Sequence, residues 1–273
     1  MIQSIVSGIL QGILEWLPIS SQGNLVLLMI NFLGYSPTQA LSFSIFLHGG
    51  TLLAVITYFR KEIKDLVLAL RKYSLYSFKK QEQTIEQRTI SFLLVSAIVT
   101  GAVGYPLFKF LNLSAFSEEI FPVIIGVSLI FTGISQKFIV SRGLKTQESL
   151  CLKDSLFLGI AQGFAIIPGI SRSGITTSGF LLRGYKLKDA LRLSFLMSIP
   201  AVLGAQVGLL ITNSFPEINI TEGLVSLLFS FLFGILTIHA FLKLTEKIKF
   251  WLFCLVLGII TLIPPIFLIL NIN

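Results

Sequence analysis

Two charged residues lie inside apolar stretches of the sequence, and together they suggest phosphate chemistry. Arg172 lies in GIAQGFAIIPGISRSGITTSG (159–179), and Glu15 lies in GILQGILEWLPISSQGNLVLLMINFLG (8–34). A guanidinium offers a planar fork of donors that fits phosphate oxygens, and a carboxylate can act as a base or bind a divalent metal. Charges inside apolar segments are costly and usually functional. The alternative is a structural ion pair between the two residues.

Hydroxyl and amide side chains surround both charges. Gln11 lies four residues before Glu15, so the two share a helix face. Ser21 lies just after Pro18 and is a candidate nucleophile, with a water molecule as the alternative. A Gly/Ser turn before a helix adds backbone donors for an anion. The residues predicted to bind phosphate oxygens are Gln11, Ser20, Gln22, Asn24, Ser171, Arg172, Ser173, Gly174 and Thr176. The alternative for the serines is that they cap the helices that follow them.

One histidine lies in an apolar stretch near the expected membrane midplane. His48, in FLHGGTLLAV, is a candidate general acid or base, because imidazole exchanges protons near neutral pH. The two glycines after it would let another backbone approach. The alternative is an interhelical hydrogen bond without a catalytic role. His239 lies near the end of its predicted span and is interpreted as structural.

The composition places these residues in a membrane protein. Of the 273 residues, 54% are hydrophobic and 12% are charged, and the mean hydropathy is +0.87. These values predict a multi-pass protein of the cell membrane. The net charge of +8 comes from basic residues in short loops between apolar spans, so we expect no nucleic-acid partner. Cys151 and Cys254 are too far apart in predicted depth for a disulfide.

Charge-free stretches predict the spans, and breaks within two apolar segments predict re-entrant helix pairs. Full spans are expected at 41–59, 89–108, 120–136 (extending past Lys137 to Val140), 193–216, 223–242 and 250–273. Interruptions in the segment 1–33 and in the segment between Asp154 and Arg183 leave halves too short to cross a bilayer. The interrupting residues are Pro18, Gly23, Pro168, Gly169 and Gly174. We therefore predict an all-α integral membrane protein with six transmembrane helices plus two re-entrant helix pairs.

Basic residues in the loops predict the orientation. By the positive-inside rule, the segments that face the cytoplasm are 60–88, 141–153, 183–192 and 243–249. The parts expected outside are the amino-terminus, 112–119, 213–221 and the carboxy-terminus. Arg172 is the one basic residue that this rule leaves deep inside an apolar segment, which again marks it as functional.

An internal repeat relates the two interrupted segments. A shift of 151 residues aligns QGILEWLPISSQG (11–23) with QGFAIIPGISRSG (162–174) without a gap. We infer a single membrane domain, 1–273, with internal repeats at about 1–140 and 150–273. Each repeat holds one re-entrant pair and three spans, an odd number, so the second copy is inverted and the two tips meet near the midplane. Both copies carry a Gly-xxx-Gly pattern that allows close helix packing: Gly8 with Gly12, and Gly159 with Gly163.

Motifs in both repeats resemble those of the undecaprenyl-diphosphate phosphatase family, which is also known for bacitracin resistance. They are QGILEWLPISSQG and PGISRSG (168–174), and the similarity extends to LHGGTLLAVITYFR (47–60) and SFLMSIPAVLGA (194–205). The resemblance implies a membrane hydrolase that removes the terminal phosphate of a C55-type polyprenyl diphosphate and recycles this carrier lipid, as in peptidoglycan synthesis. It also implies stimulation by a divalent cation, Mg²⁺ or Ca²⁺.

The resemblance also assigns roles to residues. The positions that match the family's motif glutamate, tip serine, phosphate-binding arginine and the serine and threonine after it are Glu15, Ser21, Arg172, Ser173 and Thr176. Together with the histidine discussed above, the expected catalytic residues are Glu15, Ser21, His48 and Arg172. Glu15 is also the expected metal ligand, since it is the one carboxylate in an interrupted apolar segment.

Two positions depart from the family pattern. Gln11 replaces the first glutamate, and Asn24 replaces the histidine that usually follows the tip. An amide does not transfer a proton, so Asn24 is expected only to position a phosphate oxygen or a water molecule. Proton transfer then falls to His48 or Glu15.

Two other functions fit the same architecture. A carrier or flippase for polyprenyl phosphate could use the inverted repeat, and so could an unrelated secondary transporter. Arg172 between two serines, with Glu15 opposite, favours hydrolysis of a phosphoanhydride instead. Phosphate release from a polyprenyl diphosphate by the purified protein distinguishes these classes. A homodimer is left open as the oligomeric state.

Overall fold

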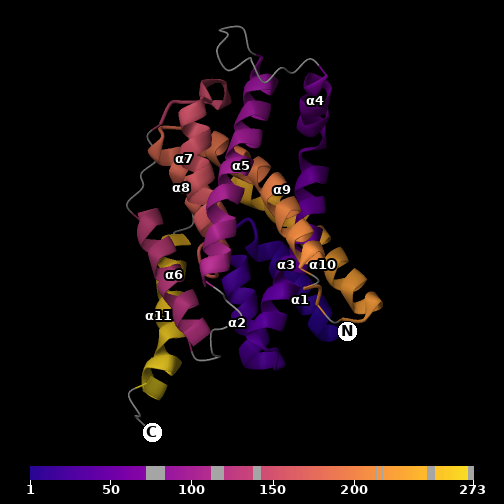
Figure 1. Ribbon diagram of the computed structural model, residues 1–273, viewed down its shortest axis with the longest axis vertical. Coiled ribbons are helices and arrows are strands. Elements are labelled where there is room, and N and C mark those ends of the chain that lie inside the picture. Colours follow the sequence, from indigo (N-terminus) through magenta and orange to yellow (C-terminus); the bar gives the residue numbers. More distant parts are fainter. Residues whose placement is uncertain are drawn as a thin grey trace.

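The computed structural model describes residues 1–71, 84–111, 120–137, 143–212, 214–216, 218–244 and 250–269, without the side chains of 111, 244, 250 and 265–269. In these residues the chain forms eleven α-helices and no β-strand, arranged as one bundle (Figure 1). The all-α prediction is confirmed for this part of the chain. The predicted outer loop 112–119 and the last residues, 270–273, lie outside the described residues.

Five of the described helices are long and apolar enough to cross a membrane: α3 (Pro37–Tyr58), α5 (Ile85–Leu111), α6 (Ile120–Lys137), α9 (Leu187–Ile211) and α10 (Ile220–Leu244). They match five of the six predicted spans and make the protein a multi-pass membrane protein. The sixth predicted span, 250–273, corresponds to α11 (Phe250–Ile269). Its described side chains form the shorter apolar segment Trp251–Pro264.

Helix boundaries differ from the prediction where charged residues enter a helix. α9 begins at Leu187 rather than at 193, because Lys188 and Arg192 lie in its first turns. α4 (Arg60–Leu70) also forms inside the basic segment 60–88, which the sequence predicts to be a loop. Charged side chains are compatible with a helix once they reach the membrane surface. A charge-free stretch therefore marks the span rather than the whole helix.

Two pairs of short helices form from the two interrupted segments. The first helix pair is α1 (Ile2–Leu14) and α2 (Ser21–Leu33). The second is α7 (Leu152–Gly163) and α8 (Arg172–Leu182), joined through the 3-10 turn η4 (Phe164–Ile166). A helix of 13 residues is about 20 Å long, shorter than the apolar core of a bilayer. The predicted breaks near Pro18 and Pro168 are confirmed.

Glycines on the first helix of each pair allow close packing. α1 packs on α10, and α7 packs on α5. A Cβ atom on Gly12 would lie 2.7 Å from the carbonyl oxygen of Ser230, and one on Gly163 would lie 2.7 Å from Cβ of Val103. No side chain fits at such distances. The prediction that the Gly-xxx-Gly patterns allow close helix approach is confirmed.

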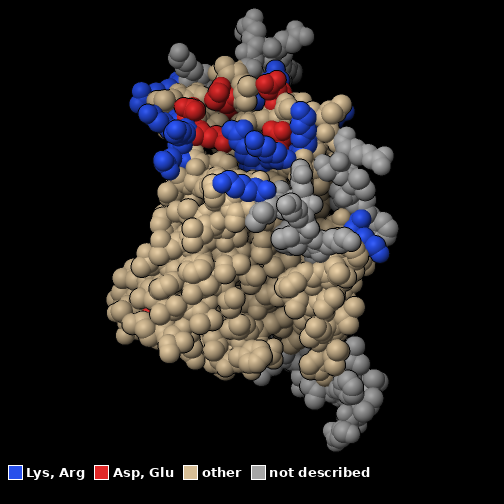
Figure 2. Space-filling model, turned by 180° about the vertical axis from the view of Figure 1, so that it is seen from behind, with Lys and Arg blue, Asp and Glu red and all other residues tan. Residues whose placement is uncertain are grey.

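Charged side chains gather at one end of the bundle. Figure 2 shows lysine, arginine, aspartate and glutamate concentrated there, next to a broad surface without charge that suits contact with lipid. α4 lies at this charged end, and the amino-terminus lies at the opposite end (Figure 1). The predicted separation of the basic segment from the amino-terminus is therefore present in the fold.

A buried carboxylate ties the two helices of the second pair together at the charged end. Asp154, in the first turn of α7, accepts hydrogen bonds from Arg183 Nε at 2.6 Å and from the Tyr185 hydroxyl at 2.8 Å. Both donors follow α8. Burial alone would raise the pKa of Asp154, but hydrogen bonds from Cys151, Arg183 and Tyr185 outweigh it and hold this pKa below its ordinary value.

The two ends of α3 should be reachable from opposite sides of a membrane, because its 22 residues span about 33 Å. The helix α4 follows the second end of α3 directly, and the 3-10 turn η3 (Gln147–Ser149) lies beside α4. In a protein without its native cysteines, we expect Thr38→Cys, at the start of α3, and Ser149→Cys, in η3, to react from opposite faces of sealed vesicles. A membrane-impermeant thiol reagent measures this. Reaction of both cysteines from the same face would contradict a membrane-spanning bundle.

The Asp154 contacts should make the stability depend on pH. A carboxyl group whose pKa is lower in the folded protein adds stability above its unfolded value of about 4 and loses that contribution as the pH falls through the folded value. We expect Asp154→Asn to lower the Tm at pH 7 and to flatten the decrease in Tm below about pH 4. Thermal unfolding in detergent tests this, and an unchanged Tm at pH 7 would refute it.

Candidate active site

The first helix pair places Glu15 and Ser21 at the two ends of a tight turn, the first tip (15–21). Glu15 follows α1 directly, and α2 begins at Ser21. Ser20 has a left-handed backbone (φ 59°), and its hydroxyl accepts a hydrogen bond from a backbone N–H of α2 at 3.3 Å. Asn24 donates from Nδ2 to the carbonyl oxygens of Ile19 at 2.7 Å and of Ser20 at 2.8 Å. Polar side chains of the tip and of the first turns of α2 therefore hold its shape.

The second helix pair presents Arg172 as the first residue of α8, at the end of the second tip (164–172). Ser171 caps this helix by accepting from the backbone N–H of Gly174 at 3.1 Å. Gly169 has a φ of 98°, which a residue with a side chain rarely adopts. A Cβ atom there would also lie 2.6 Å from the carbonyl oxygen of Ile125 in α6. The glycine thus sets the turn and lets the tip lie against α6.

The two tips contact each other, as the sequence predicts. Ser173 Oγ, just after the second tip, donates to the carbonyl oxygen of Leu17 in the first tip at 2.9 Å. A Cβ atom on Gly23 would lie only 3.0 Å from Cα of Gly169, so the two backbones almost touch. The residues predicted to do chemistry are therefore brought together from segments about 150 positions apart in the chain.

Glu15 is the centre of the contacts between the tips. Its Oε1 accepts a hydrogen bond from Arg172 Nη2 at 2.6 Å. Its Oε2 accepts from Ser21 Oγ at 2.6 Å and from Gln11 Nε2 at 3.0 Å, and it lies 3.1 Å from His48 Nε2. The Glu15 side chain is 4% exposed. The other three predicted catalytic residues thus converge on this one buried carboxylate.

Arg172 is held on three sides. Nη2 donates to Glu15, and Nη1 donates to the carbonyl oxygen of Ser194 in α9 at 3.1 Å. The guanidinium lies over the Trp16 ring, with Cζ 5.8 Å from the ring centroid. A guanidinium has five N–H donors, and the described contacts use two of them. The remaining donors are suited to phosphate oxygens, although the predicted alternative, an ion pair with Glu15, is also formed.

His48 has an acceptor beside each ring nitrogen. Nδ1 lies 2.6 Å from the carbonyl oxygen of Ser44, and Nε2 lies 3.1 Å from Glu15 Oε2. A carbonyl oxygen only accepts, so Nδ1 carries a hydrogen, and a second hydrogen is needed between Nε2 and the carboxylate. His48 and Glu15 therefore share a proton. The glycines after His48 allow α10 to approach, since a Cβ atom on Gly50 would lie 2.6 Å from the Leu227 carbonyl oxygen.

Several of the predicted diphosphate-binding residues are engaged with the backbone of the tips. Ser20 and Ser171 act as helix caps, which is the alternative that the sequence leaves open, and the backbone N–H of Gly174 is used by Ser171. Thr176 Oγ1 donates to the carbonyl oxygen of the first residue of α8 at 2.7 Å. Gln22 is half-buried next to the first tip. Contact of these residues with a phosphate stays a prediction.

Three residues that the sequence reasoning did not select also hold the cluster. Ser194 supplies only its backbone carbonyl to Arg172, so its side chain gave no signal. Gln136 Nε2 donates to the carbonyl oxygen of Pro18 at 2.6 Å and supports the first tip from α6. An amide in a predicted span was the signal for this residue. Trp16, beneath Arg172, follows Glu15 directly in the sequence.

Glu15 is the predicted metal ligand, and its carboxylate is already occupied by contacts within the protein. Both of its carboxylate oxygens are engaged by donors from other residues. Within the described ranges, no group of three or more His, Cys, Asp or Glu side chains is placed to hold a metal ion. Divalent cations need several oxygen ligands. The described residues therefore do not fit a metal held by the protein alone.

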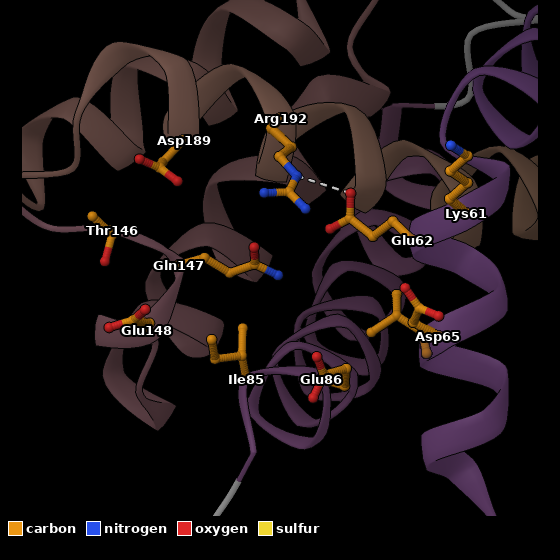
Figure 3. Close-up of a pocket in the computed structure, with 11 residues that line it drawn as sticks. Lys61, Glu62, Asp65, Ile85, Glu86, Thr146, Gln147, Glu148, Asp189 and Arg192 are labelled. Carbon is orange, nitrogen blue, oxygen red and sulfur yellow. Dashed lines mark hydrogen bonds and ion pairs between the residues drawn. The ribbon is translucent and has the colours of Figure 1, made fainter.

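A cavity of about 530 Å³ lies at the charged end, between α4, η3 and the starts of α5 and α9 (Figure 3). Arg192 Nε pairs there with Glu62 Oε2 at 2.8 Å. The five carboxylates that line it exceed its two basic side chains, which disfavours an anionic diphosphate. None of the predicted site residues is among the lining residues, which are Lys61, Glu62, Asp65, Leu66, Ile85, Glu86, Thr146, Gln147, Glu148, Asp189 and Arg192.

Similar proteins match nearly the whole length of the chain. The family model described as bacitracin resistance protein BacA matches residues 4–263. An undecaprenyl-diphosphatase of Methanococcoides burtonii is 46% identical over 262 residues, which cover 96% of this chain and 97% of the relative. A protein of the same name from Haloarcula marismortui is 36% identical and covers 93% of this chain and 93% of its own length. Another from Desulforapulum autotrophicum is 39% identical and covers 96% of this chain and 97% of its own length. The chain therefore belongs to the bacitracin resistance protein BacA family.

Proposed function

We propose that this protein is an undecaprenyl-diphosphate phosphatase, which hydrolyses the terminal phosphate of a C55-type polyprenyl diphosphate and returns the monophosphate carrier lipid. Relatives that match the whole chain bear the name undecaprenyl-diphosphatase. The observation that carries the proposal is the buried contact of Glu15 with Arg172, with Ser21 and His48 on the same carboxylate. These groups can supply a base, a phosphate clamp, a nucleophile and a proton carrier.

Ser21 and Glu15 have the geometry of a nucleophile and its base. Because Ser21 Oγ donates to Glu15 Oε2 at 2.6 Å, the carboxylate can take the proton as Oγ attacks the terminal phosphorus. The bond from that phosphorus to the bridging oxygen breaks, and polyprenyl phosphate leaves with a proton from His48. Glu15 then passes the proton it took from Ser21 to His48, which has given up its own. Water attacks the phosphorus and gives a proton to Glu15, which returns it to Ser21 Oγ as phosphate leaves.

Arg172 is the phosphate clamp in this scheme. Charge spreads over the three equatorial oxygens of the phosphoryl group in the transition state, and a planar guanidinium can bind two oxygens at once. α8 begins at Arg172, so the positive end of the helix dipole adds to the attraction. The Glu15 and Arg172 side chains are only 4% and 14% exposed, so the tips must separate to admit the diphosphate.

The divalent cation that the family resemblance implies stays a prediction. Magnesium sites commonly combine one or two carboxylates with the phosphates of the substrate. The diphosphate would then bring most of the ligands, which agrees with a protein that offers a single carboxylate at this place. A homodimer likewise stays a prediction. The comparisons do not support the alternatives of a flippase or an unrelated transporter, because the relatives are named as diphosphatases.

We propose the inverted-repeat architecture, with six spans and two re-entrant pairs, as the frame of this site. Reciprocal packing supports it: α1 lies on α10 of the other half, α7 lies on α5, α3 lies on α9, and α6 lies on α11. A two-fold axis between the halves produces such a pattern. The proposed orientation places the charged end in the cytoplasm and the amino-terminus outside, because basic residues stay on the cytoplasmic side.

Arg172→Lys should lower kcat for phosphate release about 100-fold or more while the protein still folds. A lysine keeps the positive charge but loses the planar fork, and loss of one transition-state donor typically costs this much. The assay is phosphate release from a polyprenyl diphosphate by purified protein in detergent, with the Tm as the control for folding. Near-normal turnover would mean that Arg172 is only a structural counter-ion.

Glu15→Gln should reduce hydrolysis to background, because an amide neither takes a proton from Ser21 nor pairs with Arg172. His48→Ala should lower kcat about 10- to 100-fold and change the pH profile. Asn24→Ala should lower kcat less than about tenfold, since Asn24 donates hydrogen bonds to backbone carbonyls and transfers no proton. The assignment fails if Asn24→Ala is as damaging as Glu15→Gln while His48→Ala has no effect.

A further inference from the structure

Trp16 is a fully buried aromatic residue between the two helix pairs, and the chemistry described so far gives it no part. Its side chain is 1% exposed. One face of the indole lies beneath the Arg172 guanidinium, with Cζ 5.8 Å from the ring centroid. Phe195 of α9, itself fully buried, packs edge-on against the indole with ring centroids 5.0 Å apart. The ring is therefore fixed in place next to the phosphate clamp.

The other contacts of Arg172 leave one motion of the guanidinium unrestrained. Glu15 and the Ser194 carbonyl accept hydrogen bonds from Nη2 and Nη1, at 2.6 Å and 3.1 Å. Hydrogen bonds to these two nitrogens hold one edge of the guanidinium, but they allow it to tilt about that edge. A flat aromatic face beneath the group opposes the tilt and attracts the positive charge.

We propose that Trp16 is a positioning residue for Arg172: the indole face holds the guanidinium plane, so that its remaining donors are directed at the diphosphate. The effect of Trp16 on the reaction rests on the proposed phosphatase function. The contact between the indole and the guanidinium does not depend on that function. Arg172 touches the substrate in this scheme, and Trp16 acts only through Arg172.

The indole N–H takes no part in this role. Nε1 is buried without a hydrogen-bond partner in the described residues. It faces α10, because a Cβ atom on Gly234 would lie 3.6 Å from it. A buried N–H without an acceptor is unfavourable, so the N–H does not explain a tryptophan at this position. The aromatic face does, since tryptophan gives the strongest cation–π contact of the aromatic residues. Another aromatic residue should therefore replace Trp16, and an aliphatic residue of similar bulk should not.

Emission of Trp16 tests the stacking without any activity measurement. The chain has two tryptophans, so in the Trp251→Phe protein the fluorescence excited at wavelengths that tyrosine does not absorb comes from Trp16 alone. We expect Arg172→Met in this background to change the intensity or wavelength of the emission, and Arg88→Met, an arginine that donates to the Glu148 carbonyl instead, to leave it unchanged. The proposal would be overturned if Arg172→Met left the emission unchanged, or if both substitutions changed it equally.

Phosphate release then tests the positioning role. We expect Trp16→Phe to keep kcat within about threefold of wild type and Trp16→Leu to lower it about 10- to 30-fold, the size of a desolvated cation–π contact, with a smaller change in KM. Equal losses for both variants, or a loss in KM alone, would show that Trp16 only fills the core. If the wild-type protein released no phosphate from a polyprenyl diphosphate, the proposed function would fail, and the emission test would still decide the stacking.

Discussion

The buried ion pair between Glu15 and Arg172 is the interaction on which the rest of this structure depends. The two residues are 157 positions apart and meet at 2.6 Å in an apolar bundle. Either charge alone would be costly to bury, and removing one partner of a buried pair typically destabilises a protein by about 3–5 kcal/mol. The fold therefore requires that both tips reach the same place, and the site exists only when both halves of the chain are folded.

Turns, helix caps and close helix packing in the surrounding structure bring the two tips to the Glu15–Arg172 contact. Each helix pair turns too early to span a bilayer, and local capping by Ser20 and Ser171 satisfies the backbone groups that the turns expose. Glycines allow α1 to approach α10 and α7 to approach α5, so each tip is fixed by helices of the other half. Trp16 and Ser194 then restrain the guanidinium itself. Binding and chemistry thus depend on packing between helices that are distant in sequence.

Much of this arrangement could be predicted from the sequence, because charges and breaks in apolar segments are rare and therefore informative. Glu15 and Arg172 stood out for that reason, and Pro18 and Gly169 marked the turns. The boundaries of α9 could not be predicted in the same way, since Lys188 and Arg192 fit a helix end as well as a loop.

Contacts that use backbone atoms left no pattern in the sequence. The carbonyl oxygen of Ser194 and that of Ser44 beside His48 are examples, because any residue could supply them. Asn24 is the opposite case, because its polar side chain is evident in the sequence but its partners are not. Its amide donates to backbone carbonyls of the first tip. A side-chain type indicates what a residue can bind, and only the packing decides which partner it meets.

In the proposed mechanism, the Glu15–Arg172 contact is a reaction site and not merely an ion pair that holds two tips together. Exchanging the charges tests it most directly. The double variant Glu15→Arg/Arg172→Glu keeps a buried pair of opposite charge, but it moves the base away from Ser21 and His48 and the guanidinium away from Trp16 and Ser194. Phosphate release from a polyprenyl diphosphate should then fall to background, while the Tm exceeds that of either single variant. Substantial turnover by the exchanged protein would contradict the account, because it would mean that only the pairing of the two charges matters.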